Sequence, residues 1–250
     1  MTLRELPLLA PESAAASPLA GRVVFVLAPP GSGGEAVEAA LRAGGADGRG
    51  VPSDVFARGL GDILNNFAQG AAPDAAGRGP VGDNGLAVLA GPQPVLEALR
   101  EVADTVLATP ASYVVEYSPE HARWAPFLAA VYPDATYVHV MRDGRALVAQ
   151  RDDLTHAADD WAVVTRRILD LPTDLTVHRV RVEELRGDPS GLAPLADSLG
   201  LDVAAAVRAL RAPLADLDEP DVTAAVVAAV GAAAGDVLVA LGYDPDRFGA

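Results

Sequence analysis

The sequence contains neither cysteine nor lysine, and each absence removes a class of chemistry. Without cysteine there is no disulfide, no thiolate metal site and no cysteine nucleophile. Without lysine no side-chain amine can form a Schiff base, and the 19 basic residues are all Arg. Hydrolase chemistry of the serine-elbow type also lacks support, because no Gly-x-Ser-x-Gly occurs.

Positive charge and aromatic side chains are scarce. The formal net charge of −15 opposes binding to nucleic acid and to anionic membranes. Half of the residues are apolar but only 5% are aromatic, so the core is predicted to consist of small side chains such as Ala and Val. A chain of 250 residues is long enough for one large α/β domain.

Long apolar runs are absent as well. The N-terminal stretch is interrupted by Glu5, Pro7 and Pro11, which argues against a signal peptide. Residues 222–241 are interrupted by Gly231 and Asp236 and are predicted to form a buried helix. We therefore expect a cytoplasmic protein that does not bind a membrane. The spacing of the four His residues does not suggest a ligand set, so no metal is expected.

Apolar periodicity alternates between strands and helices along the chain. Strands are predicted at 22–27, 86–89, 113–115, 135–141 and 175–182. Helices are predicted at 35–43, 53–69, 95–107, 119–131 and 157–169 and over the last fifty residues. This alternation is typical of an α/β fold with a parallel sheet covered on both faces. We expect an N-terminal arm over residues 1–20, one domain over 21–250, and an exposed loop, lid or linker at 70–84.

Residues 28–35, APPGSGGE, form a glycine-rich turn between the first strand and its helix. Such a turn can hold an anion with backbone N–H groups and the helix dipole. The same residues also fit a capping box, in which Ser32 caps the helix and Glu35 folds back over its N-terminus. Both interpretations remain open at this point.

Residues 132–151, YPDATYVHVMRDGRALVAQR, resemble the 3′-phosphate-binding segment of sulfotransferases. The closest likeness is to the tyrosylprotein-type/bacterial small-molecule branch, and in the tyrosylprotein proteins the strand–helix junction also reads Arg-Asp-Gly-Arg-Ala. A segment at 177–201 and the ending Leu241-Gly242-Tyr243 are similar to the same family. Arg142 could instead pair with Asp143 or Asp134 at the surface.

The resemblance implies a P-loop, nucleotide-kinase-like three-layer sandwich of the sulfotransferase type. It implies transfer of a sulfuryl group from 3′-phosphoadenosine 5′-phosphosulfate (PAPS) to a hydroxyl or amine of a small-molecule acceptor. By position, Ser32, Gly33, Gly34, Arg142 and Gln150 are the expected donor-binding residues, Gln150 standing where the family has Ser.

The chain departs from the family at the residues that do chemistry. Gly31 stands where the family has Lys or Arg, and Gly34 and Glu35 replace two threonines. The catalytic Glu is not matched either. Asp54, Glu116 and His121 are the candidate catalytic residues, although Asp54 also suits a helix N-terminus and the family's Lys after Glu116 is Tyr117. The alternative function is therefore a repurposed protein that no longer transfers sulfuryl groups, either a PAPS-independent enzyme or a non-catalytic binding protein.

Overall fold

The computed structural model describes residues 17–48, 92–245 and 248. Several sequence-based predictions lie outside these residues: the helix at 53–69, the loop at 70–84, the strand at 86–89 and the candidate base Asp54. The boundary of the N-terminal arm stays a prediction. Leu19 is nevertheless buried in the core, and Ser17 Oγ donates a hydrogen bond to Asp104.

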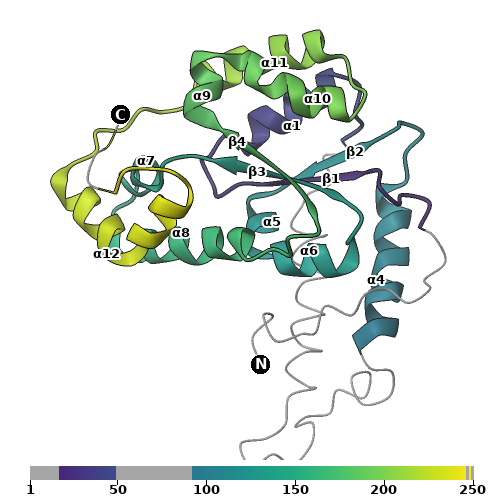
Figure 1. The fold of residues 1–250 in the computed structure, drawn as a ribbon, viewed down its shortest axis with the longest axis horizontal. Coiled ribbons are helices and arrows are strands. Elements are labelled where there is room, and N and C mark those ends of the chain that lie inside the picture. The colour runs from purple at the N-terminus through teal and green to yellow at the C-terminus, as the bar shows by residue number, and fades with distance from the viewer. Residues whose placement is uncertain (1–16, 49–91, 246–247, 249–250) are drawn as a thin grey trace, which may run out of the picture.

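Four parallel strands form the sheet, in the order β2-β1-β3-β4 (Figure 1). Their bounds are β1 Val23–Leu27, β2 Val114–Tyr117, β3 Thr136–Met141 and β4 Thr176–Arg181. Each lies within two residues of its predicted range. The strands at the middle of the sheet are nearly continuous apolar runs because helices cover both of their faces.

The helices have these bounds: α1 Gly34–Ala43, α4 Pro92–Leu107, α5 Pro119–Arg123, α6 Ala125–Val131, α7 Gly144–Val148, α8 Leu154–Leu169, α9 Val182–Gly187, η3 Pro189–Leu192, α10 Ala193–Ser198, α11 Val203–Ala215 and α12 Ala224–Ala240. The predicted helix 119–131 is two helices, α5 and α6. Pro126 lacks the N–H that a continuous helix needs, and the chain breaks at Trp124. α8 begins at Leu154, three residues earlier than predicted, because Asp153 caps it.

The helices form a layer on each face of the sheet, as Figure 1 shows. α1, α9, α10 and α11 cover one face, where they bury the side chains of Val24 and Val26. α4, α5, α6 and α8 cover the other face, over Phe25 and Leu27. This arrangement confirms the predicted three-layer α/β sandwich.

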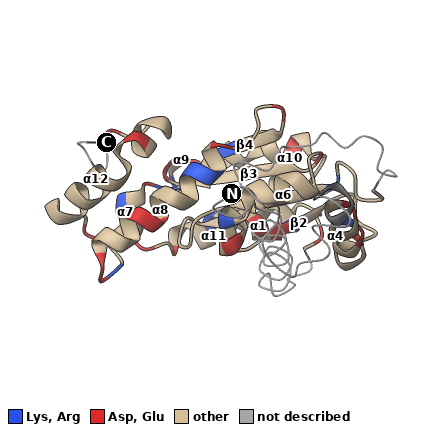
Figure 2. Ribbon diagram, turned by 90° about the horizontal axis from the view of Figure 1, so that it is seen from below, with Lys and Arg blue, Asp and Glu red and all other residues tan. Residues whose placement is uncertain are grey.

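A third apolar cluster joins α7, α8 and α12 beyond the carboxyl end of β3. α12 packs along α8 and buries one side, Val226, Val230, Ala234 and Val237. No described helix is long and apolar enough to cross a membrane. Acidic and basic positions are interspersed along the described elements (Figure 2).

Candidate functional site

The parallel register brings two sequence segments to one edge of the sheet. β1 pairs with β2 and with β3, Leu27 lying beside His139, so the loop after Leu27 and the junction after Met141 leave the sheet at the same end. Arg142 Nη1 donates a hydrogen bond to the carbonyl oxygen of Gly31 at 2.7 Å. Loop 28–33 therefore meets Arg142 at this edge of the sheet. Ligands of open α/β sheets bind at this edge.

The glycine-rich loop does not form the expected capping box. Gly33, with φ 81°, is the N-cap of α1, and no side chain caps the helix. The capping-box interpretation, in which Ser32 caps the helix, is therefore wrong, because Gly33 in the left-handed conformation takes the N-cap position instead. Ser32 is fully buried, and its Oγ finds no hydrogen-bond partner among the described residues. A buried hydroxyl without a partner suits a place where a ligand oxygen binds.

Tyr117 lies directly on the first turn of α1. A Cβ on Gly34 would stand 2.3 Å from Tyr117 Cε2, so this position requires glycine for as long as the ring packs there. Burial raises the pKa of the Tyr117 phenol, and Glu35 and Glu38 add to the effect. Where the family has a Lys beside the loop, this chain therefore presents a neutral phenol.

Arg142 is buried, and its guanidinium group donates hydrogen bonds to backbone carbonyl oxygens. Besides the bond to Gly31, its Nη2 donates to the carbonyl oxygen of Asp218. Neither of the alternative partners is used: Asp143 binds Arg145, and Asp134 binds Arg100. Burial lowers the pKa of Arg142, and the nearby Glu183 carboxylate opposes that shift.

The connection between α11 and α12 covers this arginine. We call residues 216–221, DLDEPD, the acidic segment. Arg186 on α9 pairs with Glu219 at 2.7 Å and donates to the carbonyl oxygen of Leu217 at 3.2 Å. Sequence reasoning missed this contact, although four acidic residues within six positions were a visible signal.

The other predicted donor-side residues have different partners. Gln150 is exposed, and its side-chain amide donates to the carbonyl oxygen of Ala146. Arg145 is 1% exposed and forms two hydrogen bonds to the carboxylate of Asp143. It also donates to the carbonyl oxygen of Pro245. Arg145 therefore holds the β3–α7 junction together and adds little positive potential at the surface.

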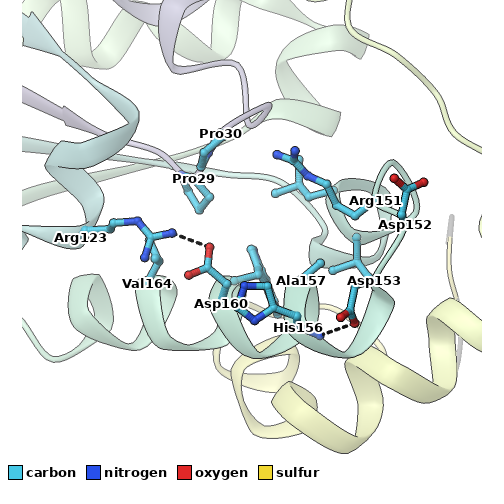
Figure 3. Close-up of a pocket in the computed structure, with 13 residues that line it drawn as sticks. Pro29, Pro30, Arg123, Arg151, Asp152, Asp153, His156, Ala157, Asp160 and Val164 are labelled. Carbon is cyan, nitrogen blue, oxygen red and sulfur yellow. Dashed lines mark hydrogen bonds and ion pairs between the residues drawn. The ribbon is translucent and has the colours of Figure 1, made fainter. Parts of the chain in front are cut away.

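A pocket of about 400 Å³ adjoins the same loop (Figure 3). Its apolar wall is formed by the loop after β1 and by residues of α7 and α8. Its polar residues lie on α5, on α8 and in the turn before α8. The lining residues are Pro29, Pro30, Arg123, Leu147, Val148, Arg151, Asp152, Asp153, His156, Ala157, Asp160, Trp161 and Val164. This size suits a small molecule.

Four polar side chains follow one side of the pocket. Arg123 pairs with Asp160 at 2.6 Å. His156 lies one turn before Asp160 on α8, and Figure 3 shows its ring beside Asp160 on the pocket side of the helix. Asp153 caps α8 by accepting a hydrogen bond from the backbone N–H of His156 at 3.0 Å. The imidazole therefore stands on a well-anchored helix end.

Residues 93–202 match the model of the sulfotransferase family. The matched segment contains β2, β3, Arg142 and β4. This segment of the chain is similar to the sulfotransferase family. Two of the solved structures that match this chain illustrate the shared fold. The sulfotransferase domain of the Synechococcus PCC 7002 olefin synthase has 16% identity and a TM-score of 0.51, over 89% of this chain and 94% of that one. Sulfotransferase STF9 from Mycobacterium avium has 13% identity and a TM-score of 0.56. That alignment covers 92% of this chain and 78% of STF9. No curated protein matches the sequence.

The sulfotransferase-family match does not assign the catalytic residues, and the roles of Glu116 and His121 stay predictions. Both side chains are buried, at 3% and 0% exposure, and neither lines the pocket. His121 packs edge-on against Phe25, with ring centroids 5.6 Å apart. Burial lowers the pKa of His121 to about 4, so its ring is neutral near pH 7. In the described part of the chain, no group of three or more His, Asp or Glu side chains could hold a metal ion.

Proposed function

We propose that this protein transfers a sulfuryl group from PAPS to a hydroxyl or amine of a small molecule. One observation carries the proposal: loop 28–33 contacts Arg142 through Gly31 and also lines the pocket through Pro29 and Pro30. A donor held by this loop would therefore adjoin an acceptor held in the pocket. In-line transfer requires that proximity.

The donor side retains part of an anion site. The first N–H groups of α1 have no partner within the helix, and the buried hydroxyl of Ser32 lies beside them. Arg142 would supply a planar pair of charged donors for a phosphate. When bound, PAPS would provide the sulfuryl group and a phosphate as leaving group. Loop 28–33 itself contributes no cation, since Gly31 stands at the basic position, and this favours weak donor binding.

His156 is our proposed proton acceptor. An acceptor hydroxyl in the pocket would lose its proton to the imidazole as its oxygen bonds to sulfur. Asp160, held by Arg123, would stabilise the imidazolium that forms. Asp54 remains a further candidate because it lies outside the described residues. The cytoplasmic location and the tyrosylprotein-like branch also remain predictions.

The test is a titration with adenosine 3′,5′-bisphosphate followed by a sulfation assay with PAPS and a panel of small hydroxyl and amine compounds, read by mass spectrometry. Loss of the charged hydrogen bonds in Arg142→Ala should weaken nucleotide binding by roughly 10- to 100-fold. Arg179→Ala is the matched control, because Arg179 is an exposed arginine on β4. Equal losses in both variants would contradict the assignment of Arg142.

A second candidate function is a repurposed protein that no longer uses PAPS. The observation that favours it is the acidic segment, whose Asp218 carbonyl accepts a hydrogen bond from Arg142. The same experiments separate the two candidates. Binding of pocket compounds without any nucleotide binding would favour the second function, whereas nucleotide binding and a sulfated product would favour the first.

A further inference from the structure

Two arginines contact three consecutive residues of the acidic segment. Arg186 donates to the carbonyl oxygen of Leu217 and pairs with the carboxylate of Glu219. Arg142 donates to the carbonyl oxygen of Asp218, which lies between them in the sequence. The two guanidinium groups come from different elements, the end of β3 and α9. Both guanidinium groups contact oxygen atoms of residues 217–219, two backbone carbonyls and the Glu219 carboxylate.

Apolar packing holds the acidic segment in this position. Leu217 is half-buried and packs against the core between the sheet and α11. A Cβ on Gly33 would stand 3.2 Å from Leu217 Cδ1, so the segment also lies against the glycine-rich loop. The segment therefore touches both parts of the proposed donor site, the loop and the arginine.

The hydrogen-bond acceptors that Arg142 and Arg186 contact resemble the oxygens of a phosphate group in their chemistry. From the acidic segment, one carboxylate and two carbonyl oxygens accept from Arg142 and Arg186, as the oxygens of a phosphate monoester would, and the Gly31 carbonyl is a further acceptor on Arg142. We infer that Arg142 and Arg186 form a two-arginine site for a phosphate monoester, and that the acidic segment occupies this site as a built-in competitor. The inference rests on the proposed function, in which the entering group is the 3′-phosphate of the donor nucleotide. Arg186 was not among the residues predicted from the sequence.

Competition of this kind links donor binding to a movement of the α11–α12 connection. A phosphate can reach both guanidiniums only after the Asp218 carbonyl and the Glu219 carboxylate have left them. A nucleotide without the 3′-phosphate does not need this exchange and should leave the segment in place. The inference therefore separates two nucleotides that differ by one phosphate.

The experiment is calorimetric titration of the full chain with adenosine 3′,5′-bisphosphate and with adenosine 5′-monophosphate. Glu219→Gln should tighten bisphosphate binding about three- to tenfold, because one ion pair and one repelling charge are removed, and should leave monophosphate binding unchanged. Glu184→Gln is the matched control: Glu184 is 76% exposed and pairs with Arg181, and Glu219 is 77% exposed and pairs with Arg186. Adding Arg186→Gln to Glu219→Gln should weaken bisphosphate binding about tenfold.

Hydrogen exchange of residues 216–222 provides an independent measurement. Bisphosphate should raise exchange there, and Leu217→Ala, which removes the apolar anchor, should raise it without nucleotide. Tight bisphosphate binding that is equal in wild type and Glu219→Gln, with unchanged exchange, would overturn the competitor and leave the proposed function intact. Absence of nucleotide binding in wild type, Glu219→Gln and Leu217→Ala would overturn the phosphate site together with the proposed function.

Discussion

At the scale of single residues, His156 is the group on which the proposed chemistry depends. Replacing it with Gln keeps a polar side chain on α8 but removes the proton acceptor. We expect His156→Gln to lower the sulfation rate about 10²- to 10⁴-fold while adenosine 3′,5′-bisphosphate binding stays unchanged. His178→Gln, on β4, should keep the wild-type rate. A His156→Gln variant that retained the wild-type rate would argue for another base.

Gly31 is the residue where function and backbone conformation conflict. Its φ is 82°, and a Cβ there would stand 3.3 Å from Leu147 Cδ2. Gly31→Arg restores the family's cation and should tighten bisphosphate binding about tenfold. It should also lower the free energy of unfolding by about 1–2 kcal/mol, since a left-handed conformation strains an L-residue. Urea denaturation measures this cost. Gly31→Asn, which tolerates that conformation better, should lose less stability and gain no affinity.

At the scale of elements, the β3–α7 junction depends on a buried ion pair. The side chains of Arg145 and Asp143 are 1% and 6% exposed. Arg145 Nη2 lies 2.8 Å from Asp143 Oδ2. Asp143→Ala leaves a buried guanidinium without its carboxylate and should cost about 3–5 kcal/mol in the free energy of unfolding. Asp236→Ala removes the carboxylate of an exposed pair with Arg166 and should change stability little. Similar losses in both variants would show that the junction does not need this pair.

The elements were also the level at which sequence reasoning worked best. Apolar runs and alternation predicted all four described strands, and the Arg142 junction followed from its neighbours in the chain. The capping residue of α1 was misjudged, because the left-handed backbone conformation of Gly33 cannot be read from the sequence Ser-Gly-Gly-Glu. The pairs Arg123–Asp160 and Arg186–Glu219 could not be predicted, because they join segments more than thirty residues apart through the packing of helices.

At the scale of the whole molecule, buried histidines should make stability depend on pH. Burial lowers the pKa of His121 to about 4 and that of His139 to about 3, whereas an unfolded histidine titrates near 6.5. Between about pH 6.5 and pH 4 the unfolded chain therefore binds more protons than the folded one, and stability falls as the pH falls. The loss for His121 alone is about 3 kcal/mol at pH 4.

Thermal unfolding between pH 7 and pH 4.5 tests this expectation. His121→Leu cannot take up a proton in either state, so the melting temperature of that variant should fall less steeply with acidification than that of wild type. His178→Gln should keep the wild-type slope. Parallel curves for wild type and His121→Leu would show that His121 is not the group responsible.

The bond between Arg145 and Pro245 has a consequence in time. These two residues are 100 positions apart in the sequence, yet the Arg145 guanidinium donates a hydrogen bond to the Pro245 carbonyl oxygen. At a synthesis rate of about 5–20 residues per second, Arg145 is made roughly 5–20 s before Pro245. During that interval Arg145 can pair with the Asp143 carboxylate, but the Pro245 carbonyl has not yet been synthesised. The nascent chain therefore completes the proposed donor side as one of its final steps, after nearly all of the sheet and helices have been made.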